Sequence, residues 1–257
     1  MFHHKKYFFI LFFIAFNFHS KAQSTVSKNG LYHDIGVMTG GIVFQSDYLQ
    51  KNPFGFQTGA NGYSFGVLYY LDSNTNYNKI SQYLKWRGEL TYIAADLQHT
   101  GKYVDISLQS TTAKQLRAMR GTVSGINLGT QVEYYPFKND DYNYATFAPY
   151  VSLGAMISVQ KTKAWSILGN INDVNVTPTK YINAFRNESV ILFSATTSIG
   201  TRIKINNKNS LFTEAKFQYY FSDWADGLNP NSAIYKENKS NDMLTYINIG
   251  YIYSFDN

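Results

Sequence analysis

Apolar and polar side chains alternate with a period of two residues along the last stretch of the chain, residues 242–257. Because successive side chains of a β-strand point to opposite faces, this alternation gathers one set of residues on a single face. That set is Thr245, Ile247, Ile249, Tyr251, Tyr253 and Phe255. The opposite face carries smaller and more mixed side chains. The pattern predicts a β-strand with one continuous apolar face, which a strand of a soluble β-sandwich can also have.

Seven upstream runs repeat this alternation. The clearest spans residues 84–95, where Trp86 and Leu90 share one face while Arg87 and Glu89 share the other. The polar face would meet solvent in a soluble protein and the lumen in a membrane barrel, and alternation alone does not choose between them. The other predicted strands span residues 33–44, 62–71, 122–135, 146–159, 188–205 and 211–221. A Thr cap and apolar residues at helical spacing predict one short amphipathic helix, over residues 112–119.

The connections between the predicted strands alternate in length. Those centred near residues 53, 108, 173 and 232 are long, and those near residues 77, 140 and 207 are short. Transmembrane barrels alternate in this way between long outer loops and short periplasmic turns, whereas a soluble sandwich has no reason to. The sequence therefore predicts an all-β fold: an antiparallel up-and-down transmembrane β-barrel of about eight strands.

The amino-acid composition fits a membrane barrel better than a soluble domain. Only 16% of the 257 residues are charged, against roughly a quarter in an ordinary soluble domain. The mean hydropathy of −0.28 excludes a helical membrane protein, but the alternation of a barrel conceals its apolar face from any average. The absence of cysteine excludes a thiol nucleophile, a thiolate zinc site and a lipid anchor on cysteine.

The first residues have the organisation of an export signal. Lys5 and Lys6 precede an apolar run at residues 7–16, and Ser20-Lys21-Ala22 is a small-x-small cleavage site. We predict a cleaved signal peptide over residues 1–22 and a barrel domain over residues 23–257, located in the outer membrane. Cleavage removes three lysines and no acidic residue, so the formal charge falls from +6 to +3. With no Lys/Arg cluster on one face, we expect no nucleic-acid partner.

Seven charged residues are predicted to point into the barrel. They are Arg87, Glu89, Glu133, Arg202, Lys204, Glu214 and Lys216. Side chains fill the interior of an eight-stranded barrel, which is too narrow for an open pore. Because both signs occur, these residues are expected to pair with one another in a lumen charge network of structural importance. The alternative is a porin-like barrel that binds or conducts a small solute or lipid through its charged lumen.

Candidate catalytic and metal-binding residues are few. His33 and His99, the two histidines after the signal peptide, are expected at opposite ends of the barrel, where they cannot share a metal or a triad. Asp96 and His99 form the one neighbouring pair that a barrel enzyme could use, and we interpret His99 as loop surface. The segment 223–227, DWADG, lacks the spacing and terminal Glu of a calcium loop. It is interpreted as a turn with Asp caps and a Trp at the membrane interface.

Tyrosines gather at the predicted strand ends. They are Tyr69, Tyr70, Tyr134, Tyr135, Tyr219, Tyr220, Tyr251 and Tyr253. Their placement at both rims is typical of interfacial aromatic belts. A carbohydrate-binding platform would instead concentrate exposed aromatic residues in the loops. We therefore interpret these tyrosines as belts.

Several segments are similar to a known family. They are HDIGVMTG at 33–40, KWRGELTYIAADLQHTGKYVD at 85–105, FAPYVSLGA at 147–155, FQYYFSDWADGLNP at 217–230 and KSNDMLTYINIGYIYSF at 239–255. Over nearly the whole chain after the signal peptide, the sequence resembles small outer-membrane β-barrel proteins of Bacteroidota. A weaker similarity links it to the small barrel component of the type IX secretion and gliding machinery. The resemblance brings no catalytic residues with it.

The resemblance also gives a role to the end of the last predicted strand. Tyr251, Tyr253 and Phe255 resemble the terminal aromatic residues of outer-membrane barrels, which implies an insertion signal recognised by the barrel-insertion machinery. Asp256 and Asn257 follow this signal, and we expect their removal to be harmless. The sequence as a whole predicts a monomeric, non-enzymatic barrel without cofactor or metal. Its expected partners are outer-membrane lipid, the insertion machinery and, through the weaker similarity, envelope secretion proteins.

Overall fold

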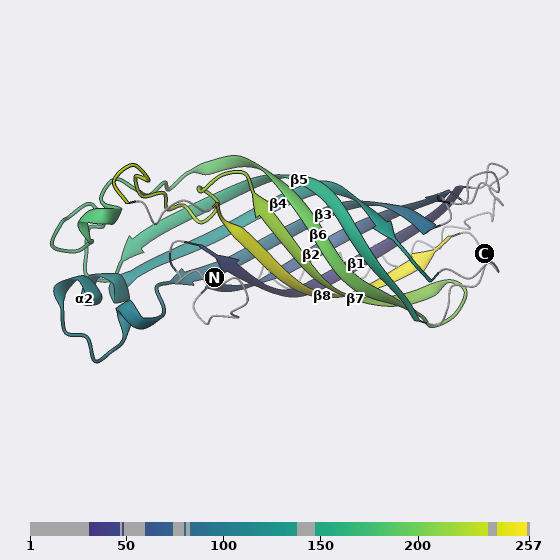
Figure 1. The fold of residues 1–257 in the computed structure, drawn as a ribbon, viewed down its shortest axis with the longest axis horizontal. Helices are drawn as coiled ribbons and strands as arrows, with labels where there is room; N and C mark the ends of the chain where they lie inside the picture. The colour runs from purple at the N-terminus through teal and green to yellow at the C-terminus, as the bar shows by residue number, and fades with distance from the viewer. Residues whose placement is uncertain are drawn as a thin grey trace, which may run out of the picture.

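Eight antiparallel strands form a closed barrel in which each strand pairs with the next and β8 pairs with β1 (Figure 1). The computed structural model describes residues 31–46, 48, 60–73, 80, 83–137, 147–235 and 241–255. The strands are β1 Leu31–Gln45, β2 Ala60–Ser73, β3 Leu84–Gln98, β4 Met119–Tyr134, β5 Phe147–Ser166, β6 Ser189–Lys204, β7 Asn209–Tyr220 and β8 Met243–Ser254. The predicted all-β, eight-stranded barrel is confirmed. The predicted signal peptide, residues 1–22, lies outside the described residues.

Long and short connections emerge at opposite ends of the barrel, as the up-and-down topology requires. We call the end with the connections after β1, β3, β5 and β7 the loop end, and the opposite end the turn end. The helix α2, Thr111–Ala118, and the 3-10 helices Lys102–Val104 and Thr179–Tyr181 belong to the loop end. The Ser110 hydroxyl caps α2 by accepting from the N–H of Ala113 at 3.3 Å, so the cap is not the predicted threonine. Among the described residues, no helix has the length and apolar character to cross a membrane.

Most strand ends lie close to their predicted positions, but β5 continues well past its predicted end at residue 159. Beyond that residue Lys161 and Lys163 still point outward, while Thr162 and Ala164 are buried. The sequence pattern stops because the outward residues turn from apolar to charged, although the backbone pairing with β4 continues to Ser166. The prediction that this strand ends at residue 159 is therefore wrong.

The outer wall of the barrel is apolar, whereas charged and polar side chains are buried in its interior, the inverse of a soluble protein. In β3, Arg87 and Glu89 are buried, while Trp86 and Leu90 are 54% and 49% exposed. Ile126 and Leu128 of β4 and Phe193 of β6 are likewise more than half exposed. An apolar outer wall around a polar interior is the arrangement of transmembrane barrels. The polar strand face lines the lumen, and the soluble-sandwich alternative is wrong.

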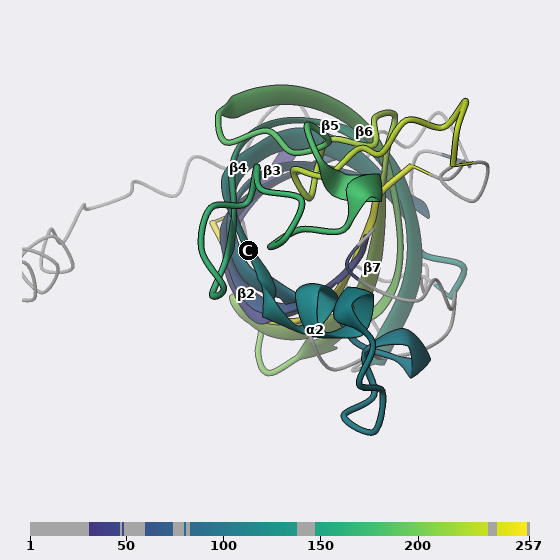
Figure 2. The same cartoon turned by 90° about the vertical axis from the view of Figure 1, so that its left-hand side faces the viewer.

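An apolar cluster fills the loop end of the interior. It joins strand residues such as Phe44, Leu97 and Leu244 to residues of two connections, Tyr181 from the β5–β6 connection and Leu228 from the β7–β8 connection. Viewed towards the loop end, the β5–β6 connection lies over part of the opening of the barrel, and α2 lies at its rim (Figure 2). The loops therefore fold into the mouth of the barrel and share its core.

Candidate functional site: the charged lumen and the loop end

A buried arginine bridges the lumen at its centre. The Arg87 Nη1 of β3 donates to Glu133 Oε1 of β4 at 2.8 Å and to Glu214 Oε2 of β7 at 2.7 Å. Because β3 and β7 are not neighbours in the barrel, the second contact spans the interior. All three side chains are 0–1% exposed. The guanidinium thus ties distant parts of the wall together without contact with solvent.

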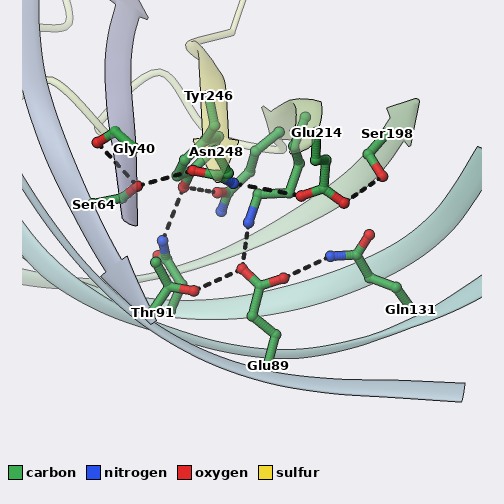
Figure 3. Close-up of polar contacts among 12 residues, drawn as sticks. Gly40, Ser64, Glu89, Thr91, Gln131, Ser198, Glu214, Tyr246 and Asn248 are labelled. Atoms are coloured by element: carbon green, nitrogen blue, oxygen red, sulfur yellow. Dashed lines mark hydrogen bonds and ion pairs between the residues drawn. The ribbon is translucent and has the colours of Figure 1, made fainter. Parts of the chain in front are cut away.

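A second buried pair joins Lys216 of β7 to Glu89 of β3. The Lys216 ammonium also lies 4.2 Å from the centre of the Tyr246 ring. Glu89 accepts further hydrogen bonds from Thr91 at 2.6 Å and from the Gln131 amide at 2.8 Å (Figure 3). A buried charge is tolerated only when it is paired and hydrogen-bonded, and both conditions hold for this carboxylate.

Hydroxyl groups supply further hydrogen bonds to the other two carboxylates, Glu133 and Glu214. The Tyr135 hydroxyl donates to Glu133 at 2.6 Å, and the Tyr150 and Ser198 hydroxyls donate to Glu214 at 3.0 and 2.9 Å. Tyr150 reaches Glu214 by lying over Gly200, where an added Cβ would come within 2.6 Å of the tyrosine ring. The narrow lumen therefore needs a residue without a side chain at this point.

A third group of charges lies nearer the turn end. Arg202 Nη2 donates to Asp34 at 3.0 Å, and the Lys85 ammonium lies 3.2 Å from Asp72 and 3.6 Å from Asp34. Asp34, Asp72 and Lys85 are absent from the predicted set. Lys85 could have been included, because it shares the β3 face of Arg87 and Glu89. Asp34 is a single charge among glycine and apolar residues on its face of β1, so its strand offered no such pattern.

The structure places six of the seven predicted lumen residues inside the barrel. Arg87, Glu89, Glu133, Glu214 and Lys216 form the central group, and Arg202 belongs to the turn-end group. Lys204 lies at the turn end of β6 and is half-buried. The contacts leave the central group without bulk water, since its members are at most 2% exposed.

The interpretation of all eight tyrosines as belts is wrong for three of them. Tyr70, Tyr135 and Tyr220 are buried in the lumen. The reason is strand geometry, because two adjacent residues of a strand face opposite sides and only one of each pair can meet the membrane. The outward members are Tyr69, Tyr134, Tyr219, Tyr251 and Tyr253.

His99 is not on the loop surface, as its position in sequence had predicted, but is 6% exposed in the mouth of the barrel. Its ring packs between Tyr48 and Tyr181, with centroid distances of 4.9 and 5.4 Å. Burial lowers the pKa of His99 to about 3, so the imidazole is neutral at ordinary pH. Asp96 points to the outer wall instead. The pair that a barrel enzyme would have used is thus divided between the two sides of the wall.

His33 lies at the turn end, where its Nδ1 and the Tyr69 hydroxyl are 2.6 Å apart. The two histidines therefore lie at opposite ends, as predicted. Within the described residues, no three side chains of the metal-binding types come together.

The segment at residues 223–227 forms the predicted capped turn, but its tryptophan does not face the membrane. Asp226 Oδ1 accepts from the N–H of Leu228 at 2.7 Å, and Gly227 has a left-handed φ of 82°. Trp224 packs against the apolar cluster of the mouth, and the centre of its ring lies 4.2 Å from the Cζ of the Arg186 guanidinium. The ring holds two outer connections together, and the prediction of an interfacial Trp is wrong.

The three predicted insertion-signal residues share the outer face at the turn end of β8. Tyr251 is 39% and Phe255 44% exposed, and Tyr253 is half-buried. The rings of Phe255 and Tyr253 pack edge to face, with their centroids 5.4 Å apart. The backbone N–H of Phe255 donates to the His33 carbonyl at 3.1 Å. The rings thus lie where lipid or another protein can reach them.

Comparison with solved structures finds similar chains at low sequence identity. The chain is similar to Ail, the attachment invasion locus protein of Yersinia pestis, which was solved with the heparin analogue sucrose octasulfate. The two sequences are 11% identical, the match covers 87% of this chain and 98% of Ail, and the TM-score is 0.43. It is also similar to a major outer membrane protein from Thermus thermophilus, at 11% identity, 86% and 99% coverage and a TM-score of 0.48. No protein-family model and no curated protein matches the sequence.

Proposed function

We propose that this chain is a non-enzymatic, non-conducting outer-membrane barrel that carries a folded outer lobe and acts through that lobe on another envelope protein. The observation that carries the first part is the filled interior. Arg87 and Lys216 are 0% exposed in the centre, and Tyr181 and Leu228 are buried in the mouth. Side chains rather than water fill such a lumen.

Three connections form the outer lobe and are joined by hydrogen bonds. They comprise residues 99–118, 167–188 and 221–235. The Gln115 amide of α2 donates to the Val174 carbonyl at 2.9 Å, and the N–H of Ile167 donates to the Ala118 carbonyl at 3.1 Å. The N–H of Asn229 donates to the Ala184 carbonyl at 2.7 Å. Because three connections hold each other in place, the lobe presents a defined surface.

An apolar tip on this lobe is the candidate contact surface. Ile106 is 84% and Tyr103 63% exposed. Both lie in the β3–β4 connection and so are not part of the apolar wall that faces lipid. Arg117 fixes their backbone by donating to the carbonyls of Asp105 at 2.7 Å and Leu108 at 3.0 Å. Apolar side chains held out on an ordered loop are typical of a protein contact site. We assign the tip, residues 103–108, to partner binding.

The conductance experiment tests the closed interior. Purified barrel inserted into a planar bilayer is expected to show no ion current, because the central side chains leave no water path. Channel events that disappear on Arg202→Gln or Glu214→Gln would contradict the proposal. They would support the alternative of a narrow-conduction barrel with a charged lumen.

The pull-down experiment tests the lobe. Ile106→Asp is expected to abolish recovery of defined partners from solubilised outer membrane, because it places a charge in the apolar tip. Ile80→Asp is the matched control, since Ile80 is 67% exposed but lies in the β2–β3 connection at the turn end. Equal recovery with both variants would contradict a role for the tip.

The finer proposal is that the partner belongs to type IX secretion. Its support is the sequence resemblance to small Bacteroidota barrels and, more weakly, to a component of that machinery. Deletion of the gene is then expected to reduce secretion, and the Ile106→Asp variant is expected to fail to restore it. Secretion that is unchanged by the deletion would leave the barrel with a different partner.

A further inference from the structure

The outer wall changes from apolar to polar along one edge, at the loop end of β3, β4 and β5. The register places Tyr92, Ile126 and Val159 side by side as an apolar row. The next outward row is Ala94, Ser124 and Lys161, followed by Asp96, Thr122 and Lys163 and then by Gln98, Arg120 and Trp165. A membrane barrel meets the lipid headgroups where its wall makes this change. We call the three polar rows the headgroup edge.

Charge on the outer wall of the described strands is confined to this edge. Among the described strand residues, the charged side chains that point outward are Asp96, Arg120, Lys161 and Lys163. Three of the four are basic. Lys161 and Lys163 are exposed, and no carboxylate of the described residues forms an ion pair with either of them. Two ammonium groups on neighbouring outward positions of one strand attract an anion that lies against the wall.

A hollow of about 550 Å³ lies on the same edge. Lys163 is next to it, because its ammonium lies 5.8 Å from the centre of the Trp165 ring, which lines the hollow. Its lining includes Asn61, Asp96, Gln98, Arg120, Gly121 and Trp165. Amide, carboxylate and guanidinium groups can donate to and accept from several hydroxyl groups at once, and the indole provides a flat apolar surface. Arg120 is held rigidly, because its Nη1 donates to the carbonyls of Arg117 at 2.6 Å and Met119 at 2.8 Å. This set of groups suits a sugar ring better than a lipid tail.

We propose that the headgroup edge binds a phosphorylated glycolipid of the outer leaflet. The sugar occupies the hollow against Trp165, and a phosphate contacts Lys161 and Lys163. The acyl chains follow the apolar row of Tyr92, Ile126 and Val159 towards the turn end. This inference rests on the membrane placement of the proposed function, but not on a protein partner of the lobe.

The test uses the full barrel, purified in detergent, and native mass spectrometry with bisphosphorylated lipid A. The wild type is expected to retain lipid A. The double variant Lys161→Gln, Lys163→Gln is expected to bind it roughly tenfold more weakly, because two charged contacts of surface strength are lost. Trp165→Ala is expected to weaken binding of lipid A and of its dephosphorylated form alike, whereas the lysine variant affects the phosphorylated form alone.

Two controls keep the outcome interpretable. Lys208→Gln removes an exposed lysine from the turn end and is expected to leave lipid A binding unchanged. Phosphatidylglycerol, which is anionic but has no sugar, is expected to bind the wild type much less than lipid A does. Equal retention of the two lipids, or unchanged affinity in both headgroup-edge variants, would overturn the proposal. Because the measurement contains no partner protein, its failure is distinct from failure of the pull-down.

Discussion

Replacing Arg87 by leucine is expected to destabilise the barrel by roughly 3–5 kcal/mol, the usual loss when one partner of a buried ion pair is removed. The substitution leaves Glu133 and Glu214 without the cation that each contacts at 2.8 and 2.7 Å. Their remaining hydrogen-bond donors are hydroxyl and amide groups, which lower the cost of burial but do not replace the direct ion pairs. Ordinary domains are stable by only about 5–15 kcal/mol, so a loss of this size is a large part of the stability of a typical domain.

Urea unfolding of the purified barrel, followed by tryptophan fluorescence and by mobility on unboiled gels, measures the loss. Lys208→Leu removes an exposed cation and is the control. The triple variant Arg87→Leu, Glu133→Gln, Glu214→Gln is expected to recover part of the stability, because it removes the unpaired charges together with the cation. An unfolding midpoint for Arg87→Leu that equals the wild type would show that the bridge contributes nothing to stability.

The sequence predicted the strands and their faces because alternation of period two is a local property. Residues 84–95 display it within a single element, and the face with Arg87 and Glu89 is the buried one. The same periodicity should have divided each pair of adjacent tyrosines between wall and lumen. The end of β5 was missed for a related reason, since the outward Lys161 and Lys163 resemble loop residues when the barrel around them is unknown.

The partners of the charged residues could not be predicted, because they depend on register and closure. Arg87 and Glu214 are 127 positions apart and meet across the lumen. A shift of one residue in the register of the strands between them would turn either Arg87 or Glu214 from the lumen to the membrane. The folding of loops into the mouth was equally hidden. Nothing in the sequence around His99 shows that Tyr48 and Tyr181 cover it.

The aromatic end of β8 poses a different question, because its side chains face outward. Phe255 contacts Tyr253 with its ring and the His33 carbonyl with its backbone N–H. The backbone contact survives any substitution except proline, and the ring is 44% exposed. Surface substitutions of this kind usually change stability by no more than about 0.5 kcal/mol. An effect of the ring on assembly in cells would therefore point to recognition rather than to folding.

Phe255→Ala is accordingly expected to reduce the amount of assembled barrel in the outer membrane of cells, while the refolded variant unfolds in urea at the wild-type midpoint. Unboiled gels of membrane fractions measure the first quantity. The matched control is Phe217→Ala on β7, whose ring also faces outward and is 38% exposed. A signal carried by Tyr251, Tyr253 and Phe255 requires normal assembly of the control. Equal losses for both variants, or a lower midpoint for Phe255→Ala, would assign the ring to ordinary packing.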